Sequence, residues 1–372
     1  MQLFDDFVRT DFRKAKHSDP IYTFINNSAW RSVNYIREKL EDWAKHLKPT
    51  KDFIKRFKST DNNQHRSALL ELYIHEFLRL HGYQIEIHKS ADDTSSKFPD
   101  FEAKSENSCF FIECTHSINP LNEDEGTLSR VNNALDIIED ISSPSYFITV
   151  HFESIGSKSI PKKHLTSYII TLIEQKIDDD SFHIKCLPYI KDDWKINFGL
   201  IKKQKSTSVT IASNMIGGLG FTNSVKPLKR SLSNKRGSKY GKLNNPYLIV
   251  INTHDVMILD EDISKALYGI NNPGEGIGNS FFFNKGIPQN TRVSGVLLLQ
   301  NLVHFNMDSV NISLWHNPWA THQLEGKEID VTQIRPILSE TKLILNRIGP
   351  RISISERMNL IKDYYTWPIN DL

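Results

Sequence analysis

Apolar positions recur at helical spacing in the first eighty residues. One stripe follows residues 29–47 and consists of Trp30, Val33, Ile36, Leu40, Trp43 and Leu47. A second stripe follows in residues 65–82, where Gly82 is a helix stop, and consists of Leu70, Ile74, Phe77 and Leu78. Spacings of three and four residues place such side chains on one face of a helix. The pattern predicts a helical N-terminal extension over residues 1–60 and a further helix over 65–82.

Shorter apolar runs follow, and their pattern predicts strands. Residues 83–88 form the first, and a hairpin is expected through the polar turn 104–108 into the run FFIECT at 110–115. A helix over 127–141 and a strand over 145–152 come next. Buried-strand patterns return at 245–255, 292–301 and 309–320, with a helix over 260–269 after the first of them. Residues 331–372 are expected to form a peripheral helical tail.

This order predicts an α/β fold in which a mixed central sheet is flanked by helices, with helical extensions at the N- and C-termini. The main domain is expected over residues 61–330. A basic insertion is expected within it at about 155–245, because the alternation of strand and helix resumes afterwards. A glycine-rich loop at 214–221 matches no phosphate-binding pattern and is expected to be structural.

Composition favours a folded cytoplasmic protein over a membrane or secreted one. The chain has 372 residues, of which 39% are hydrophobic and 24% are charged. No apolar run reaches the length of a membrane span, and the N-terminus carries acids where a secretory signal carries basic residues. Cys109, Cys114 and Cys186 lack the spacing of a zinc site. We therefore expect reduced thiols and no membrane association.

Charge is distributed unevenly along the chain. Residues 194–254 contain no Asp or Glu but 11 Lys and Arg, so the remainder carries a net charge of −9, against +2 overall. A basic segment of this kind predicts contact with a polyanion such as nucleic acid. A solvated surface and an acidic protein partner are the alternatives. The residues expected to bind nucleic acid are Lys226, Lys229, Arg230, Lys235, Arg236, Lys239 and Lys242.

Two acids mark the predicted hairpin as a candidate site. Asp100 follows a proline at the start of one strand, and Glu113 lies within the next, on the same face as Thr115. Two carboxylates on adjacent strands suit Mg²⁺, which prefers oxygen ligands and retains water. Glu71 adds an acid inside an apolar helix, where a charge needs a partner, and Glu76 is the competing acid. The alternative is a surface hairpin with solvated acids.

Six residues within positions 65–153 form a recognisable pattern on the predicted helix and strands: Glu71, Pro99, Asp100, Glu113, Cys114 and Thr115. Together with the order of elements, they resemble the PD-(D/E)XK nuclease superfamily, which has the restriction-endonuclease-like fold. The resemblance implies that Glu71, Asp100 and Glu113 are catalytic and bind Mg²⁺ or Mn²⁺. Thr115 stands where the family has a lysine; its hydroxyl would orient water or phosphate but brings no positive charge. The E-x-T ending is similar to a variant branch of uncharacterised, defence-related bacterial proteins.

A lysine elsewhere in the chain is a candidate replacement for the missing one. In the basic stretch 226–241, Leu228, Leu232 and Lys235 would share one face of a helix. A helix that continues would add Lys239 to that face, whereas one that ends at Gly237 would leave Lys235 alone. One hypothesis is that a lysine of this face reaches the site and replaces the missing motif lysine. The favoured interpretation is that these lysines contact the phosphate backbone and have no catalytic role.

These features predict a metal-dependent nuclease that hydrolyses phosphodiester bonds in DNA, in defence against phage or foreign DNA. The alternative is a catalytically inactive nuclease-fold subunit that binds nucleic acid or scaffolds a larger defence complex. A third hypothesis is an effector that becomes active only within such an assembly. The expected partners are therefore DNA and either further copies of the chain or other subunits of a defence system.

Overall fold

A computed structural model describes residues 2–87, 98–117, 124–175, 183–185, 188–204, 210–216, 225–236, 240, 243–254, 258–270, 277–324, 329–338 and 343–366; for 183–185 and 213–216 it describes the backbone alone. The chain divides into two compact units, which are described separately below. Unit 1 comprises Met1–Arg13, Pro20–Asn119 and Asn223–Leu372. Unit 2 comprises Lys14–Asp19 and Pro120–Thr222.

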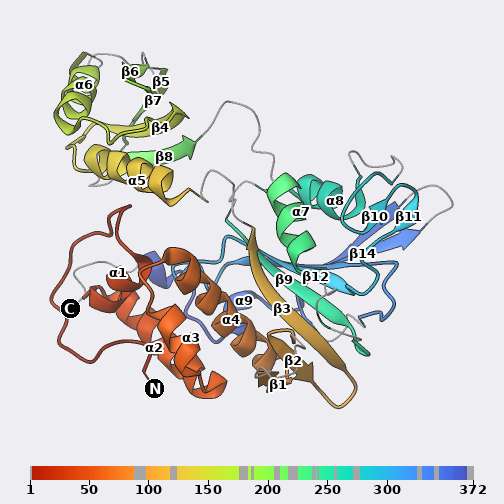
Figure 1. Ribbon diagram of the computed structural model, residues 1–372. Coiled ribbons are helices and arrows are strands. Elements are labelled where there is room, and N and C mark those ends of the chain that lie inside the picture. Colours follow the sequence, from red (N-terminus) through yellow and green to blue (C-terminus); the bar gives the residue numbers. More distant parts are fainter. Residues whose placement is uncertain are drawn as a thin grey trace. The chain divides into compact units, whose positions relative to one another are not determined.

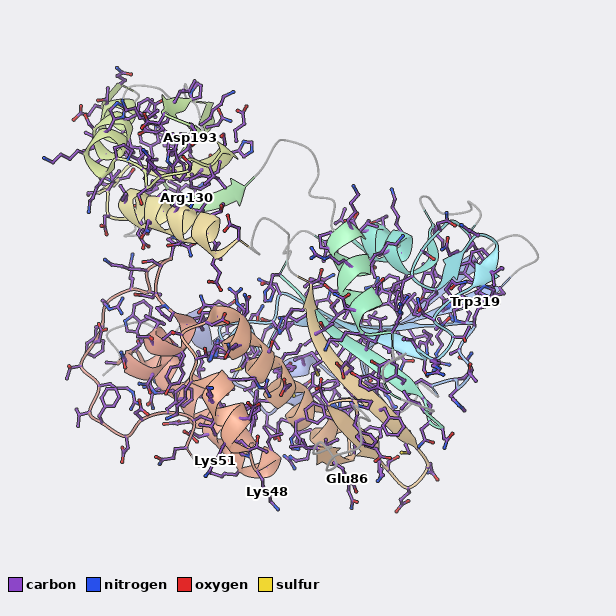
Figure 2. All side chains as sticks on the ribbon, in the orientation of Figure 1. Lys48, Lys51, Glu86, Arg130, Asp193 and Trp319 are labelled. Atoms are coloured by element: carbon purple, nitrogen blue, oxygen red, sulfur yellow. The ribbon has the colours of Figure 1, made fainter. Side chains whose placement is uncertain are left out.

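Unit 1 begins with four helices (Figure 1), namely α1 (Ile21–Asn27), α2 (Arg31–Leu47), α3 (Lys51–Phe57) and α4 (Asn62–Leu80). At the start of α4 the Asp61 side chain accepts the N–H of Asn63 at 2.8 Å. The helix ends just before Gly82, whose φ of 86° favours glycine. A left-handed residue, Lys48, separates α2 from α3, and Lys48 and Lys51 are exposed there (Figure 2). The predicted helices at 29–47 and 65–82 are confirmed.

An eight-stranded mixed sheet forms the centre of unit 1. In spatial order its strands are β1 (Gln84–Ile87), β2 (Phe101–Lys104), β3 (Cys109–Ser117), β9 (Tyr247–Thr253), β12 (Gly295–Gln300), β13 (Asn311–His316), β14 (Thr332–Leu338) and β15 (Leu343–Ile348). β1, β2 and β3 are antiparallel, whereas β9 runs parallel to both β3 and β12. A separate two-stranded hairpin consists of β10 (Phe283–Asn284) and β11 (Ile287–Pro288). The predicted α/β fold with a mixed central sheet flanked by helices is confirmed.

Helices cover both faces of this sheet (Figure 1). On one face α1 to α4 pack with Ile112 and Cys114 of β3. On the other face α7 (Val225–Asn234) and α8 (Asp260–Tyr268) pack with Phe111 of β3 and Tyr247 of β9. Successive side chains of a strand point to opposite faces, so Glu113 shares the α7 face with Phe111. The sequence alternation in FFIECT predicted this division.

The helical tail expected over residues 331–372 is wrong. Its first half forms the antiparallel pair β14 and β15, and β14 runs parallel to β13. Only short helical turns follow in the described residues, α9 (Ile354–Arg357) and a 3₁₀ turn at Tyr364–Thr366. Short runs that contain Ile, Thr and Leu fit either element by periodicity alone. Pairing with an existing sheet edge decides for the strand.

Unit 2 has a sheet and a core of its own. The sheet order is β5-β7-β4-β8, with β6 also paired to β7. The strands are β4 (Tyr146–Ser154), β5 (His183–Lys185), β6 (Tyr189–Lys191), β7 (Trp194–Lys202) and β8 (Ile211–Ile216). Its helices α5 (Glu125–Glu139) and α6 (Lys162–Gln175) share one apolar cluster with β4, β6 and β7, centred on Trp194 and Phe152.

The boundaries expected for the insertion were wrong. We expected the helix at 127–141 and the strand at 145–152 to belong to the main domain, but α5 and β4 lie in unit 2. The inserted unit covers Pro120–Thr222 instead of about 155–245. The acid-free stretch 194–254 is therefore divided between the two units, and part of it is the buried strand β9. Local pattern predicts the type of an element, whereas distant pairing decides which sheet it joins.

Two further expectations concern cysteines and membrane spans. Cys109 is half-buried and Cys114 is buried, and neither forms a disulfide; Cys186 lies outside the described residues. Among the helices of the described residues, none is both long and apolar enough to cross a membrane.

Candidate active site

The candidate site lies where β2 ends beside β3. The described pairs between the two strands stop at Phe101 and Ile112, whereas β3 continues through Glu113 along β9. Asp100 immediately precedes β2, and its Oδ2 accepts the N–H of Cys114 at 2.8 Å. The Asp100 carboxylate thus accepts a backbone N–H of β3 that would have paired with the backbone of β2 if that strand were longer. The early end of β2 lets side chains from both faces of the sheet approach one another.

Lys235 makes an ion pair with Glu113. The Glu113 residue is only 3% exposed, and its Oε1 accepts a hydrogen bond from Lys235 Nζ. Lys235 follows the end of α7, where its N–H donates to the Leu232 carbonyl at 2.9 Å. Its own carbonyl accepts the Tyr247 hydroxyl at 2.7 Å. The backbone of Lys235 is therefore fixed, and its side chain reaches the second motif acid. Lys239, the other candidate, lies outside the described residues.

Glu71 approaches from α4, on the opposite face of the sheet. Both of its carboxylate oxygens accept hydrogen bonds from Arg56 of α3, at 2.7 and 2.8 Å. Arg56 also pairs with Asp52 at 3.1 Å. The competing acid, Glu76, pairs with Arg79 at 2.8 Å and does not line the cleft described next. Of the two acids of this helix, Glu71 is thus the one at the site, and it has a cationic partner.

A cleft of about 460 Å³ brings these groups together. Its lining includes Glu71, Asp100, Thr115 and Lys235, which are four of the residues that the sequence singled out. Glu113 is not part of the lining but contacts it through Lys235. The further lining side chains that matter below are Arg56, Arg66, His116 and His254.

The carboxylates influence one another electrostatically. Burial, and then the charges of Glu113 and Glu71, raise the pKa of Asp100 to about 7, although the Cys114 N–H and Lys235 oppose the shift. Burial alone would lower the pKa of Lys235, but the Glu113 carboxylate more than offsets this and the net shift is upward. Burial and Glu113 also raise the pKa of Tyr240. Lys235 therefore stays charged at neutral pH, whereas Asp100 changes its charge there.

This raised pKa predicts that Asp100→Asn stabilises the metal-free protein at alkaline pH. A carboxyl with a raised folded-state pKa binds its proton more tightly in the native state, so stability falls as pH rises from about 4 to about 7. Asparagine mimics the protonated form and still accepts the Cys114 N–H. Since one pKa unit corresponds to about 1.4 kcal/mol, the expected gain at pH 8 is a few kcal/mol.

Urea unfolding in EDTA at pH 8 and at pH 6 measures this effect. The advantage of Asp100→Asn should be larger at pH 8 than at pH 6. Asp42→Asn, at a surface acid whose side chain is 56% exposed, is the control and should change little. An equal effect of Asp100→Asn at both pH values would contradict the raised pKa.

The carboxylates fit a hard divalent cation in part. Their mutual repulsion, visible in the pKa of Asp100, is what such an ion would offset. Within the described ranges, however, no three His, Cys, Asp or Glu side chains form a ready group of metal ligands. Mg²⁺ commonly takes one or two carboxylates together with water and substrate phosphate. Asp100 and Glu113 match that requirement, whereas Glu71 would first have to leave Arg56.

The basic residues of α7 and of the segment that follows it differ in exposure. Lys226, Arg230 and Arg236 are exposed, and Lys229 is half-buried, with its Nζ donating to the Asn279 carbonyl at 3.3 Å. Lys235 alone among these described residues lines the cleft. Lys239 and Lys242 lie outside the described residues. The helix thus carries exposed cations on the same face of the sheet as Glu113, and contact with nucleic acid stays a prediction.

Sequence reasoning missed several residues of the cleft. Arg56 precedes Glu71 by fifteen positions, and no local pattern indicates their pairing. Arg66 lies five residues before Glu71 on the same helix, a separation that the neighbour spacings of three and four residues do not single out. His116 and His254 come together through the parallel pairing of β3 with β9, and their rings stack with centroids 5.0 Å apart. That pairing could not be read from either strand alone.

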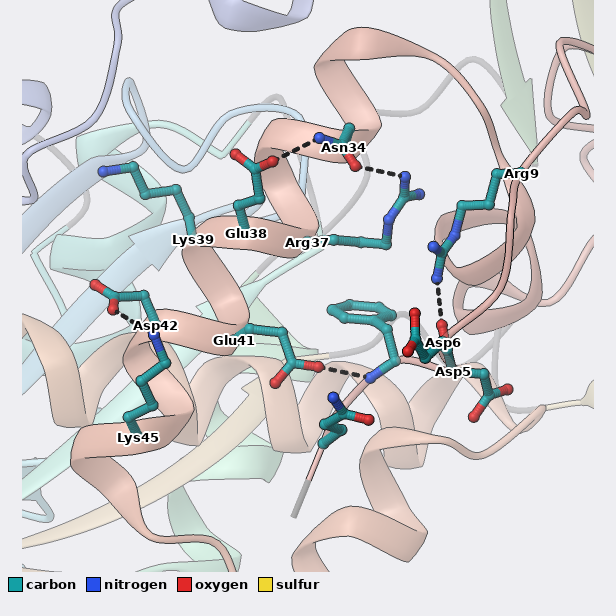
Figure 3. A pocket seen from close by; sticks show the side chains of 12 residues that line it. Asp5, Asp6, Arg9, Asn34, Arg37, Glu38, Lys39, Glu41, Asp42 and Lys45 are labelled. Atoms are coloured by element: carbon teal, nitrogen blue, oxygen red, sulfur yellow. Dashed lines mark hydrogen bonds and ion pairs between the residues drawn. The ribbon is translucent and has the colours of Figure 1, made fainter.

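A second hollow lies away from these residues, between the N-terminal segment and α2 (Figure 3). Its volume is about 790 Å³, and several of its charged groups already have partners. Glu41 accepts the N–H of Phe4 at 2.9 Å, and Arg37 donates to the carbonyls of Ile25 and Ser28 at 2.7 and 2.8 Å. Arg9 donates to the Asp5 carbonyl at 2.6 Å. These bonds attach the N-terminal segment to α2, and we assign this hollow no chemistry.

Comparison with known proteins does not indicate a function, so the function must be argued from the geometry of the cleft. No protein-family model, no curated protein and no solved structure matches this chain.

Proposed function

We propose that the protein is a metal-dependent nuclease that hydrolyses phosphodiester bonds in DNA. One observation carries the proposal: the side chain of Lys235 makes an ion pair with Glu113 in the cleft that Asp100, Thr115 and Glu71 line. The motif position two residues after Glu113 holds Thr115, which lacks a charge. Lys235 supplies that charge from another element, so the acids and a lysine are present together.

The order and direction of elements support a restriction-endonuclease-like core. The chain runs from α4, which carries Glu71, through the antiparallel strands β1, β2 and β3. It returns through α7 to β9, which is parallel to β3. This is the element order of the resemblance, with α7 and β9 in place of the helix and strand first expected. Unit 2 is inserted between β3 and α7, and Lys235 follows directly after that crossover helix.

Asp100 and Glu113 would hold Mg²⁺ or Mn²⁺. Such an ion, when bound, lowers the pKa of a water molecule and offsets negative charge on the phosphate. Lys235 keeps a positive charge at neutral pH and would stabilise the charge that develops on the phosphate oxygens during hydrolysis. The Thr115 hydroxyl would orient the attacking water or a phosphate oxygen through a hydrogen bond. The exposed cations of α7 would bind the strand on either side.

A second candidate function is a catalytically inactive nuclease-fold subunit that binds nucleic acid or scaffolds a defence complex. The observation that favours it is the charge balance of the cleft. Arg56 already pairs with Glu71, and Lys235 already pairs with Glu113, so two of the three acids are neutralised without a metal. A role in defence against phage or foreign DNA, in either case, follows from the sequence resemblance.

A cleavage assay distinguishes the two candidates. Supercoiled plasmid, linear DNA and RNA are incubated with the protein in Mg²⁺ and in Mn²⁺, with Glu113→Gln as the control. We expect cleavage of DNA that requires the ion and that Glu113→Gln abolishes. Binding of DNA without cleavage in either ion would favour the inactive subunit. Cleavage of RNA alone would retain the chemistry and change the substrate.

A further inference from the structure

Arg66 is a cation of the cleft that has no partner among the described residues. It lies in α4, is half-buried and lines the cleft. Its Nε is buried, and in the described part of the chain the Arg66 side chain forms no hydrogen bond or ion pair. Burial lowers its pKa, and no acid opposes that shift. Arg56, in the same lining, has its pKa raised by Glu71.

Other arginines of this protein show that such a state is unusual here. Arg37 is 6% exposed, and its guanidinium donates to two carbonyls and to Asn34. Arg130 and Arg357 each have a buried Nε without a partner, but both donate through Nη2. Burial of a charge that lacks a partner is unfavourable. An arginine kept in this state is suited to an anion that arrives from outside.

The surroundings of Arg66 are neutral imidazoles rather than acids. His116 Nδ1 and His254 Nε2 are 3.0 Å apart, and His65 Nε2 and His304 Nε2 are 3.1 Å apart. Burial, and then the charge of Arg66, hold the pKa of His116 at about 4, although the Arg66 carbonyl opposes the shift. Among the described residues the buried Nε2 of His116 makes no hydrogen bond of normal geometry, and the Arg66 carbonyl lies near enough to the ring to act on its pKa. The Nε of Arg66 and the Nε2 of His116, neither of which makes a normal hydrogen bond among the described residues, therefore belong to residues that line the same cleft.

We propose that Arg66 and His116 form a second phosphate subsite, which holds the phosphodiester next to the one that is cut. This inference rests on the proposed nuclease function and specifies its substrate. The planar guanidinium matches the geometry of phosphate oxygens. Arg66 and His116 line the same cleft as Asp100 and Lys235, so a phosphate held at Arg66 and one cut beside Asp100 would belong to one bound strand. The substrate is then a strand with at least two consecutive phosphodiesters.

The first test uses inorganic phosphate and no nucleic acid. The His116 ring signal is followed by NMR at pH 7 in EDTA as phosphate is added, and it is assigned through His116→Asn. Phosphate should shift this signal in the wild type and in the control Arg351→Gln, whose side chain is 81% exposed. Arg66→Gln should abolish that shift. An equal shift in Arg66→Gln, or none in the wild type, overturns the subsite.

The second test compares two substrates in Mn²⁺. Arg66→Gln should lower kcat/KM for an oligonucleotide at least tenfold, because one bidentate phosphate contact is lost. It should leave bis(p-nitrophenyl) phosphate, which has a single phosphodiester, within about twofold of the wild type. Arg66→Gln should also keep or raise the Tm, since removing an unpaired buried charge is not destabilising. Equal losses on both substrates, or a lower Tm, indicate a structural arginine and contradict the proposal.

The outcomes separate the subsite from the proposed function. If phosphate shifts the His116 signal in a way that depends on Arg66 but no nucleic acid is cleaved, the subsite stands and the nuclease function fails. If DNA is cleaved equally well by Arg66→Gln and phosphate leaves His116 unchanged, the nuclease function stands and the subsite fails.

Discussion

Replacing Lys235 with methionine is expected to lower the rate of DNA cleavage about a hundred- to a thousandfold, the usual effect of removing one charged group that stabilises a transition state. Lys235 is the cation that contacts Glu113, and Thr115 cannot supply that charge. Rates are measured on a labelled DNA duplex in Mg²⁺ at saturating substrate, so that the loss appears in kcat. Lys235→Arg, which keeps the charge in a larger group, should retain part of the activity.

Two controls accompany this variant. Lys265→Met removes an exposed lysine of the neighbouring helix α8 and should leave kcat unchanged. Thermal unfolding is followed in parallel, because Lys235→Met leaves a buried carboxylate without its partner, at a cost of about 3–5 kcal/mol. Lys239→Met tests the other lysine of the basic stretch. A folded Lys235→Met protein with undiminished kcat would remove Lys235 from the mechanism.

The second large expected effect is a steep loss of stability below about pH 6. Burial lowers the pKa of His65, His75 and His316 to about 4. A histidine with a lowered folded-state pKa binds its proton more tightly when the chain is unfolded, so stability falls as pH drops from about 6.5 towards 4. Each such residue contributes a loss of about 2 kcal/mol at pH 5. The three together are comparable with the whole stability of many domains.

Urea unfolding at pH 7.5 and pH 5 measures this loss, and His75→Leu is a matched test of its origin. The Nδ1 of His75 is buried and has no hydrogen-bond partner among the described residues, so leucine replaces it without breaking a bond there. His75→Leu should reduce the difference between the two pH values by about 2 kcal/mol. Protonation of Asp100 stabilises the folded protein as the pH falls and therefore partly masks the loss. Repeating the comparison in Asp100→Asn removes this contribution. A stability that is equal at pH 5 and pH 7.5 would contradict the neutral buried histidines.

Most local elements of this fold can be read from the sequence. The stripes at 29–47 and 65–82 are strong because they run over several helical turns, and they correspond to α2 and α4. The hairpin of β2 and β3 follows from two short runs around a polar turn. The sheet membership of β4 could not be read, because its partners β7 and β8 come later in the chain and resemble any other strand.

For the candidate site, the sequence likewise predicted individual residues but not how they pair with one another. Glu71, Asp100 and Thr115 were found because their types and spacing match a motif, and the cleft contains all three. Lys235 was found through its phase with Leu228 and Leu232, and both leucines are fully buried on the face that α7 turns to the sheet. The partners of these residues escaped prediction. The pairing of Arg56 with Glu71 depends on how α3 packs against α4, and that packing leaves no trace in local spacing.

The most direct test of the account is the position of a bound metal ion. Crystals grown with Mn²⁺ are examined by anomalous diffraction in the wild type and in Asp100→Ala. The account predicts a manganese ion that contacts the carboxylates of Asp100 and Glu113 beside Lys235, and that is lost in Asp100→Ala. Manganese bound elsewhere, or an intact ion pair of Lys235 with Glu113 and no metal in the cleft, would contradict it.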